Sequence, residues 1–325
     1  MPVSLRIQAL AIAAVALLWP AASALAQDYP TRSVRIVVPF GAGGPADVYA
    51  RIMAQHLTES LKQNFVVENR PGAGAIIGTN EVAKSAPDGY TLLMMSNTHT
   101  TNESLIPNKP FQLMRDFTPI TPVNYSDVMM VVHPSSGAKN LKDFIALAKS
   151  KPGQLNYASS GPGTPYHMAG ELFKAMSGTD IVHVPHKTSG DMRSSVLGGH
   201  VQMMFDAITV LAPNVQSGQL IALGTSGKKR SDVMPEVPTI DEAGVPGYES
   251  TIWLGFMAPT GTPKPVIDKL NAELVKAMNR PDVRAAWAKQ GAVPMPMSPA
   301  EFDKYLRADI EKWAKVVKVS GAKAQ

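Results

Sequence analysis

Short apolar runs and amphipathic stretches alternate along this 325-residue chain. A short apolar run bounded by turn residues is typical of a buried strand, whereas apolar residues three and four apart indicate one face of a helix. Strands are predicted at residues 34–39, 65–68, 90–95, 127–133, 155–158, 181–184, 201–205, 221–225 and 252–258. Helices are predicted at residues 45–61, 74–85, 139–149, 265–278 and 299–319, with one more after Thr164.

This alternation predicts an α/β protein with open, mostly parallel sheets and ligand loops at the carboxyl ends of the strands. The economical arrangement is two lobes, each a mostly parallel sheet flanked by helices. Two crossover strands, near residues 122–131 and 248–255, would form the hinge. We therefore expect lobe one to comprise residues 27–127 and 250–325, and lobe two to comprise residues 128–249.

The N-terminus has the pattern of a secretory signal peptide. Arg6 is its only charged side chain, residues 9–19 are apolar, and Ala24-Leu25-Ala26 has the small-x-small form of a cleavage site. No later segment reaches the roughly 18 apolar residues that a membrane-spanning helix needs. We expect residues 1–26 to be removed and the mature protein to be soluble and exported.

The composition limits which cellular compartment and which class of partner we expect for this chain. The chain has no cysteine, which excludes disulfides, thiolate metal sites and a lipid anchor. An unanchored exported protein stays near its cell when an outer membrane confines it, so a Gram-negative periplasm is expected. The net charge of +5 is modest and its basic residues are scattered, which argues against nucleic acid as a partner.

Two glycine-rich segments each follow a predicted strand and precede a predicted helix. The first loop, residues 40–47, reads FGAGGPAD, and the second loop, residues 159–167, reads SSGPGTPYH. In both, a proline stands where the helix would begin, a position that tolerates its missing N–H. The free N–H groups and the dipole of a helix N-terminus favour an anion. Two such loops far apart in the chain predict a carboxylate clamp that closes from two sides.

The residues of the first loop are similar to the P-x-x-x-G-G-x-x-D signature of the Bug-type binding proteins of tripartite tricarboxylate transporters. Further similar segments lie along the mature chain, at residues 67–74, 86–92, 157–167, 201–206 and 235–239. The resemblance implies a two-lobed periplasmic binding fold that closes on a small carboxylate. It implies delivery of that ligand to a membrane permease, with a membrane sensor as the alternative partner. The resemblance implies that backbone amides of the two loops and bridging waters, and not a conserved arginine, hold the carboxylate.

The resemblance also carries over candidate ligand-binding residues. They are Phe40, Gly41, Ala42, Gly43 and Asp47 of the first loop, Ser96, Asn97 and Thr98 after the third strand, Ser159, Ser160, Gly163, Thr164 and His167 of the second loop, and His186 and Asp206. The sequence departs from the family at two positions. Where the family usually reads V-P-Y-K-G, residues 184–188 of this chain read VPHKT, so His186 replaces the tyrosine and Thr188 replaces the glycine. What that loop offers a ligand is therefore open.

Several of these residues have a structural interpretation as well. Asp47 and His167 stand at equivalent positions, and each is expected to support its loop more than to touch a ligand. His183 and His186 would lie on opposite faces of a strand, so no metal site is predicted. No dinucleotide, Walker, G-x-S-x-G or H-E-x-x-H motif occurs, so we expect no cofactor and no enzyme activity, with an exported hydrolase as a remote alternative. A monomer is expected.

Overall fold

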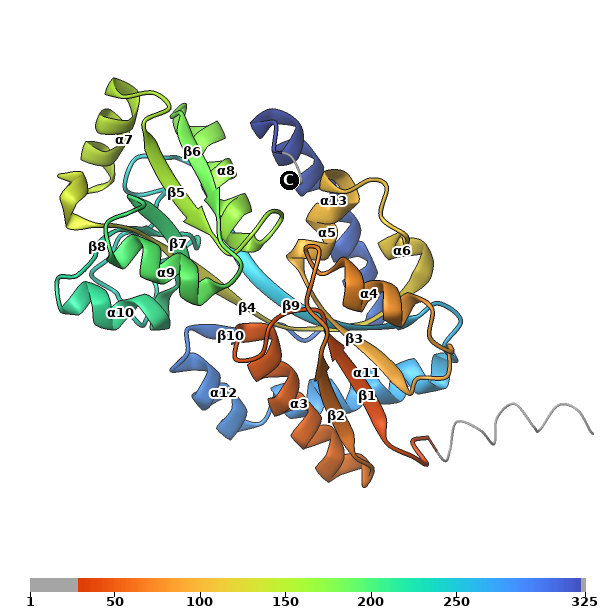
Figure 1. Cartoon of the computed structure of the whole chain (residues 1–325). Helices are drawn as coiled ribbons and strands as arrows, with labels where there is room; N and C mark the ends of the chain where they lie inside the picture. The colour runs from red at the N-terminus through yellow and green to blue at the C-terminus, as the bar shows by residue number, and fades with distance from the viewer. Residues whose placement is uncertain (1–28, 323–325) are drawn as a thin grey trace, which may run out of the picture.

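The computed structural model describes residues 29–322, so the predicted signal peptide lies outside the described residues. These residues form two α/β lobes joined by long strands (Figure 1). Lobe one contains β1 (Val34–Val38), β2 (Phe65–Asn69), β3 (Thr91–Ser96), β9 (Thr251–Pro259) and β10 (Ala292–Pro294), with helices α3 (Pro45–Leu61), α4 (Ile76–Ala83), α5 (Asn97–Leu105), α6 (Leu113–Asp116), α11 (Lys264–Met278), α12 (Pro281–Ala288) and α13 (Pro299–Ser320).

Lobe two is built from the middle of the chain. It contains β5 (Leu155–Ser159), β6 (Ile181–Pro185), β7 (Met203–Ala207) and β8 (Ile221–Thr225), the short 3-10 helix η1 (Pro134–Ser136), and helices α7 (Leu141–Ser150), α8 (Pro165–Ser177), α9 (Ser189–Leu197) and α10 (Ile208–Gln216). Strand β4 (Phe117–Val132) belongs to both lobes.

The strands follow the order β2-β1-β3-β9-β4-β7-β5-β6, and β8 and β10 also pair with β4. Strands β2, β1 and β3 are parallel in lobe one, as are β7, β5 and β6 in lobe two. Strands β4, β8, β9 and β10 run antiparallel to their neighbours. The pair β4 and β9 is antiparallel because the chain crosses between the lobes along one strand and returns along the other. The two-lobed α/β fold is confirmed, and its sheets are mixed.

The hinge lies where β4 changes partners. β4 pairs with β9 as far as Asp127, and it pairs with β7 from Val128 onward. The return connection runs beside it, since Ser226 donates its N–H to the Val128 carbonyl at 2.9 Å and Ser250 donates to the Ser226 carbonyl at 3.0 Å. Strand β9 begins at the next residue, Thr251.

Each lobe has its own apolar core. The central strand β1 reads VRIVV and is almost wholly buried, as expected for a parallel strand covered on both faces. Lobe one packs apolar side chains on both faces of its sheet, and lobe two forms one large cluster around β4, β5 and β7. The burial of these strands explains why they read as continuous apolar runs in the sequence.

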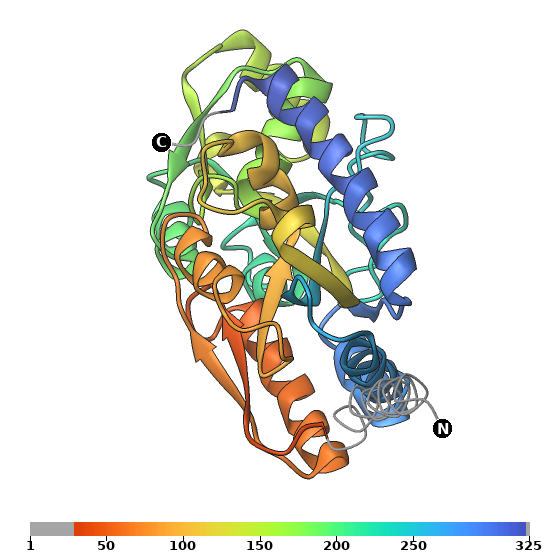
Figure 2. The same ribbon diagram turned by 90° about the vertical axis from the view of Figure 1, so that its right-hand side faces the viewer.

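The last helix joins the two lobes. The first half of α13 places Phe302 and Leu306 in the core of lobe one. Near its end, Trp313 and Val316 pack against Met168 of α8, in lobe two. Figure 2 shows α13 running from lobe one to the helices of lobe two. Within residues 29–322, no helix is both long and apolar enough to cross a membrane.

Candidate functional site

The first loop is held by Asp47, which comes from the first turn of α3. Gly43 has a φ of +77° and donates its N–H to Asp47 Oδ2 at 2.9 Å. Arg51, one turn later, donates its Nε to Asp47 Oδ1 at 3.0 Å. The side chain of Asp47 is almost wholly buried. Each carboxylate oxygen accepts one of these hydrogen bonds, so Asp47 ties the loop to the first turns of α3.

The electrostatics of this anchor favour a charged Asp47. Burial acts to raise the pKa of its carboxyl, but hydrogen bonds from Arg51, the Gly43 N–H and Asn69 outweigh burial and lower the pKa below its usual value. Asn69 also donates to the Phe40 carbonyl at 3.2 Å and accepts from Arg51 at 3.1 Å. Sequence reasoning missed Arg51 and Asn69. The i, i+4 spacing of Asp47 and Arg51 was the available signal.

The second loop repeats this plan with a neutral anchor. Gly163 has a φ of +72° and donates its N–H to Nδ1 of His167 at 3.0 Å. Ser159 Oγ accepts from the Gly161 N–H at 3.1 Å, and Thr164 Oγ1 donates to the Gly161 carbonyl at 2.6 Å. The two loops thus share one geometry, in which a left-handed glycine donates to the side chain four residues later.

The rings of Tyr157, His167 and His183 stack on one another beside the second loop. The rings of His167 and His183 stack with centroids 4.0 Å apart, and both stack on Tyr157. His183 Nε2 lies 2.6 Å from Ser159 Oγ, within the same loop. Burial lowers the pKa of His167 to about 4 and that of His183 to about 3. Both imidazoles are therefore neutral at pH 7, which lets His167 Nδ1 accept the Gly163 proton.

The residues after β3 lie beside the first loop. Continuing the β1–β3 register places Phe40 next to Ser96, and the Phe40 ring contacts His99 edge-on. Ser96 caps α5 by accepting from the Thr98 N–H at 3.2 Å. Asn97 Oδ1 and Thr98 Oγ1 are buried and find no hydrogen-bond partner in the described part of the chain. Since such atoms are costly to bury, this edge has polar capacity that a ligand or water could use.

Three predicted site residues of lobe two stand in one row. His186 donates its N–H to the Ser159 carbonyl at 2.9 Å, which places it beside Ser160. On the other side, continuing the β5–β7 register places Asp206 beside Ser160. His186 is half-buried, and its Nδ1 lies 3.1 Å from the Val184 carbonyl of its own strand. The row Asp206–Ser160–His186 forms the carboxyl edge of the parallel strands, where ligands of open α/β sheets bind.

Asp206 is buried and accepts hydrogen bonds from three protein groups. It is 1% exposed, and Oδ1 accepts from the Ala207 N–H at 2.8 Å. Oδ2 accepts from Arg193 Nη1 at 2.8 Å, and the Tyr166 hydroxyl also donates to this carboxylate. Burial raises the pKa of Asp206 despite these three partners, which favour its charged form. Arg193 of α9 and Tyr166 of α8 were not predicted as site residues.

The two lobes touch beside the second loop. A Cβ on Gly163 would lie 2.9 Å from Asn102 Oδ1 and 3.0 Å from Leu105 Cδ2, both on α5 of lobe one. Asn102 in turn donates its Nδ2 to the Gly74 carbonyl at 2.8 Å. The structure thus brings the second loop against α5, whose first residues flank the first loop.

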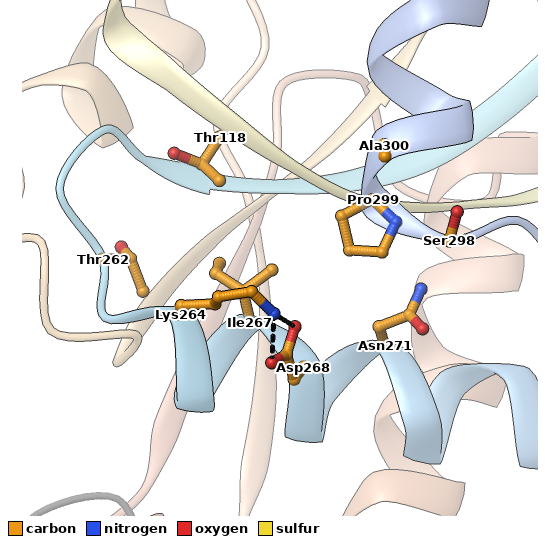
Figure 3. A pocket seen from close by; sticks show the side chains of 9 residues that line it. All are labelled: Thr118, Thr262, Lys264, Ile267, Asp268, Asn271, Ser298, Pro299 and Ala300. Carbon is orange, nitrogen blue, oxygen red and sulfur yellow. Dashed lines mark hydrogen bonds and ion pairs between the residues drawn. The ribbon is translucent and has the colours of Figure 1, made fainter. Parts of the chain in front are cut away.

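A hollow of about 540 Å³ lies elsewhere, between the starts of α11 and α13 (Figure 3). Lys264 in its wall is paired with Asp268 at 2.6 Å, and Asn271 donates to the Met297 carbonyl at 2.8 Å. None of the predicted ligand residues lines it. Within residues 29–322, no group of three or more histidines and acidic side chains could hold a metal ion.

Comparison with known proteins decides the family. A family model described as "Tripartite tricarboxylate transporter family receptor" matches residues 49–322. The chain belongs to this family. BugT of Bordetella pertussis is 37% identical over 93% of this chain and 94% of its own length. A UPF0065 protein from the tcbD-tcbE intergenic region of Pseudomonas sp. strain P51 is 36% identical over 94% of this chain and 92% of its own length.

Solved structures of the same family agree with the fold. An R. palustris protein with adipate has a TM-score of 0.85 and 33% identity, covering 91% of this chain and 99% of that one. MatC of Rhodopseudomonas palustris with bound malate has a TM-score of 0.81 and 32% identity, covering 89% and 100%. The periplasmic binding protein BugD has a TM-score of 0.82 and 32% identity, covering 91% and 100%. The Bug-type resemblance read from the sequence is confirmed, and the family is one of binding receptors.

Proposed function

We propose that the mature chain is a periplasmic solute receptor that captures a small organic carboxylate between its lobes and delivers it to a membrane permease. The observation that carries this proposal is the shared plan of the two loops. Each lobe presents a helix N-terminus behind a glycine loop, and the second loop abuts the lobe that carries the first. Family members with adipate and malate support the class of ligand.

In this proposal the candidate residues have different tasks. The N–H groups of Gly43 and Gly163 are bonded to Asp47 and His167, so these four residues shape the loops. The anion is then held by the remaining loop amides and by the first-turn N–H groups of α3 and α8, which have no partner inside their helices. The unpartnered oxygens of Asn97 and Thr98 would serve bridging water or a ligand hydroxyl.

In this proposal the hinge separates lobe one, residues 27–127 and 250–325, from lobe two, residues 128–249. The receptor works as a monomer without a cofactor, after removal of residues 1–26. It binds its ligand without turning it over, since the donors proposed to hold the carboxylate are backbone N–H groups and the charged side chains beside them, Asp47 and Asp206, are paired with arginines.

The test is binding by the purified mature chain. Calorimetry and thermal unfolding would use adipate, malate, citrate, glutamate and benzoate, with glucose as a neutral control. A ligand at a hundredfold excess over Kd stabilises the folded state by about 2.7 kcal/mol, which raises Tm by several degrees. The recovered ligand should be unchanged by mass spectrometry. Binding of glucose with no response to any anion would contradict the proposal.

A matched pair of variants locates the site. Gly43→Val adds a branched side chain to the first loop at a φ of +77°, where a Cβ meets no atom within 4 Å. Gly137→Val adds the same side chain at a φ of +79°, also in open space, but after η1 and outside both loops. Backbone strain is therefore equal, and only Gly43→Val should abolish carboxylate binding. Equal affinities of the two variants would remove the first loop from the site.

A further inference from the structure

Arg193 is a cation at the carboxyl edge of lobe two that the proposed capture by loop amides does not use. It lies in the second turn of α9, directly after the loop that carries His186. Its Nη1 donates to Asp206 Oδ2 at 2.8 Å. Asp206 follows Met204, the partner of Ala158 in β5, by two residues, and it also accepts from Tyr166 at the start of α8, so this contact places the guanidinium near the second loop.

The surroundings of the pair are asymmetric. The Asp206 side chain is 1% exposed, whereas 31% of the Arg193 side chain remains exposed. Asp206 accepts from Arg193, Tyr166 and the Ala207 N–H, and its burial keeps the carboxylate from direct contact with a ligand. A guanidinium has five N–H donors in a rigid fork, and the contact with Asp206 uses one nitrogen. Asp206 therefore acts as the support that orients Arg193.

We infer that Arg193 makes this receptor select dicarboxylates over monocarboxylates, by donating to the second carboxylate of a ligand whose first carboxylate is held by the loop amides. This inference rests on the proposed function. Backbone amides of a helix N-terminus accept one carboxylate without a cation. A second carboxylate on the same small molecule still needs a partner, and a partly exposed guanidinium is well suited to a carboxylate because its fork matches the two oxygens.

The chemistry sets the size of the effect. A hydrogen bond to a charged group contributes an amount that corresponds to roughly tenfold to a hundredfold in affinity. Monocarboxylates of equal chain length lack this contact but keep the apolar contacts and the loop amides. The ratio of the two Kd values, dicarboxylate against monocarboxylate, therefore isolates Arg193 from the rest of the site.

The experiment measures this ratio by calorimetry for adipate against hexanoate, glutarate against pentanoate, succinate against butyrate, and malate against 3-hydroxybutyrate. The wild-type chain should bind its best dicarboxylate at least about tenfold more tightly than the matched monocarboxylate. Arg193→Leu should remove that preference and leave monocarboxylate affinity within about twofold. Arg193→Lys, which keeps the charge but not the fork, should keep part of it. Arg307→Leu is the control, since it breaks an exposed pair with Asp303 on α13 and should change nothing.

Loss of Arg193 leaves a buried carboxylate without its cation, so Arg193→Leu is accompanied by the double variant Arg193→Gln, Asp206→Asn, which buries no charge. Both variants are checked by thermal unfolding. A preference that persists in the folded double variant would overturn the inference. So would a wild-type chain that binds a monocarboxylate as tightly as its dicarboxylate, and in that case the proposed function would stand. If the wild-type chain binds no carboxylate of either kind, the proposed function fails and the inference fails with it.

Discussion

Gly43 and Gly163 occupy equivalent positions in the two loops but differ in what surrounds them. Both have a φ near +75°, and both donate their N–H to the side chain four residues later. A Cβ on Gly43 would meet no atom within 4 Å, whereas a Cβ on Gly163 would meet Asn102 Oδ1 at 2.9 Å. Replacing each glycine by alanine therefore separates backbone strain from contact between the lobes.

The expected magnitudes follow from these geometries. Alanine in the left-handed region costs about 1–2 kcal/mol, and about 0.4–1 kcal/mol is regained because the unfolded chain is stiffer. Gly43→Ala should therefore lower the free energy of unfolding by about 1 kcal/mol. Gly163→Ala adds displacement of Asn102, which is buried and would lose its hydrogen bond to the Gly74 carbonyl. That loss and the overpacking add about 1–2 kcal/mol.

Urea unfolding of the ligand-free protein measures both values. The variant Asn102→Ala, alone and combined with Gly163→Ala, completes a double-mutant cycle in which the cost of the alanine at position 163 should shrink when Asn102 is absent. Small-angle scattering tests whether the lobes separate to relieve the contact. If Gly43→Ala and Gly163→Ala are equally stable and have equal radii of gyration, the described contact between the second loop and α5 does not exist in solution.

Three further predictions concern the groups that support the loops. Asp47→Ala should cost about 1–3 kcal/mol of unfolding free energy at pH 7. Because the folded pKa of Asp47 is lowered, this difference should begin to shrink in urea titrations as the pH falls below about 4, and it should be lost as the pH falls through the folded pKa. The pKa of His167 falls to about 4 on folding, so below about pH 6.5 the unfolded chain binds a proton at this residue that the folded chain does not. The wild-type protein should therefore lose up to about 1.4 kcal/mol of unfolding free energy per pH unit at this residue between about pH 6 and 5, and His167→Gln should remove this loss. Lys174→Met should lower stability by about 3 kcal/mol, because it leaves buried Glu171 without its cation at 2.9 Å, and a change below about 1 kcal/mol would contradict that role.

The sequence predicted the elements whose side chains are apolar. The 34–39 run became β1, and the helix predicted at 45–61 became α3 with the same bounds, because Pro45 begins it and its apolar stripe faces the core. Helix α5 was not predicted, since Asn97–Leu105 reads NTHTTNESL and has no apolar stripe. Its burial depends on polar contacts such as Thr100 Oγ1 to Asp309 Oδ2 at 2.6 Å, and no local pattern indicates a partner 209 residues away.

Prediction of the site was limited in the same way. The glycine loops and the prolines at the helix starts are local signals, and the structure places them where the sequence did. The anchors of Asp206 depend on how α8 and α9 pack against β7, which only the fold specifies. The short elements α6, α9, α10, α12 and β10 were also missed, because segments this short carry little periodicity.

The path of α13 has a consequence for engineering. Receptors of this family with different ligands are obvious parents for chimeras in which one lobe is exchanged. A cut at the two hinge crossings alone would leave Trp313 and Val316 of one parent facing the α8 surface of the other, around Met168. A functional exchange of lobe two must therefore include the final turns of the chain, so the transplant has three segment boundaries, although the hinge has two strands.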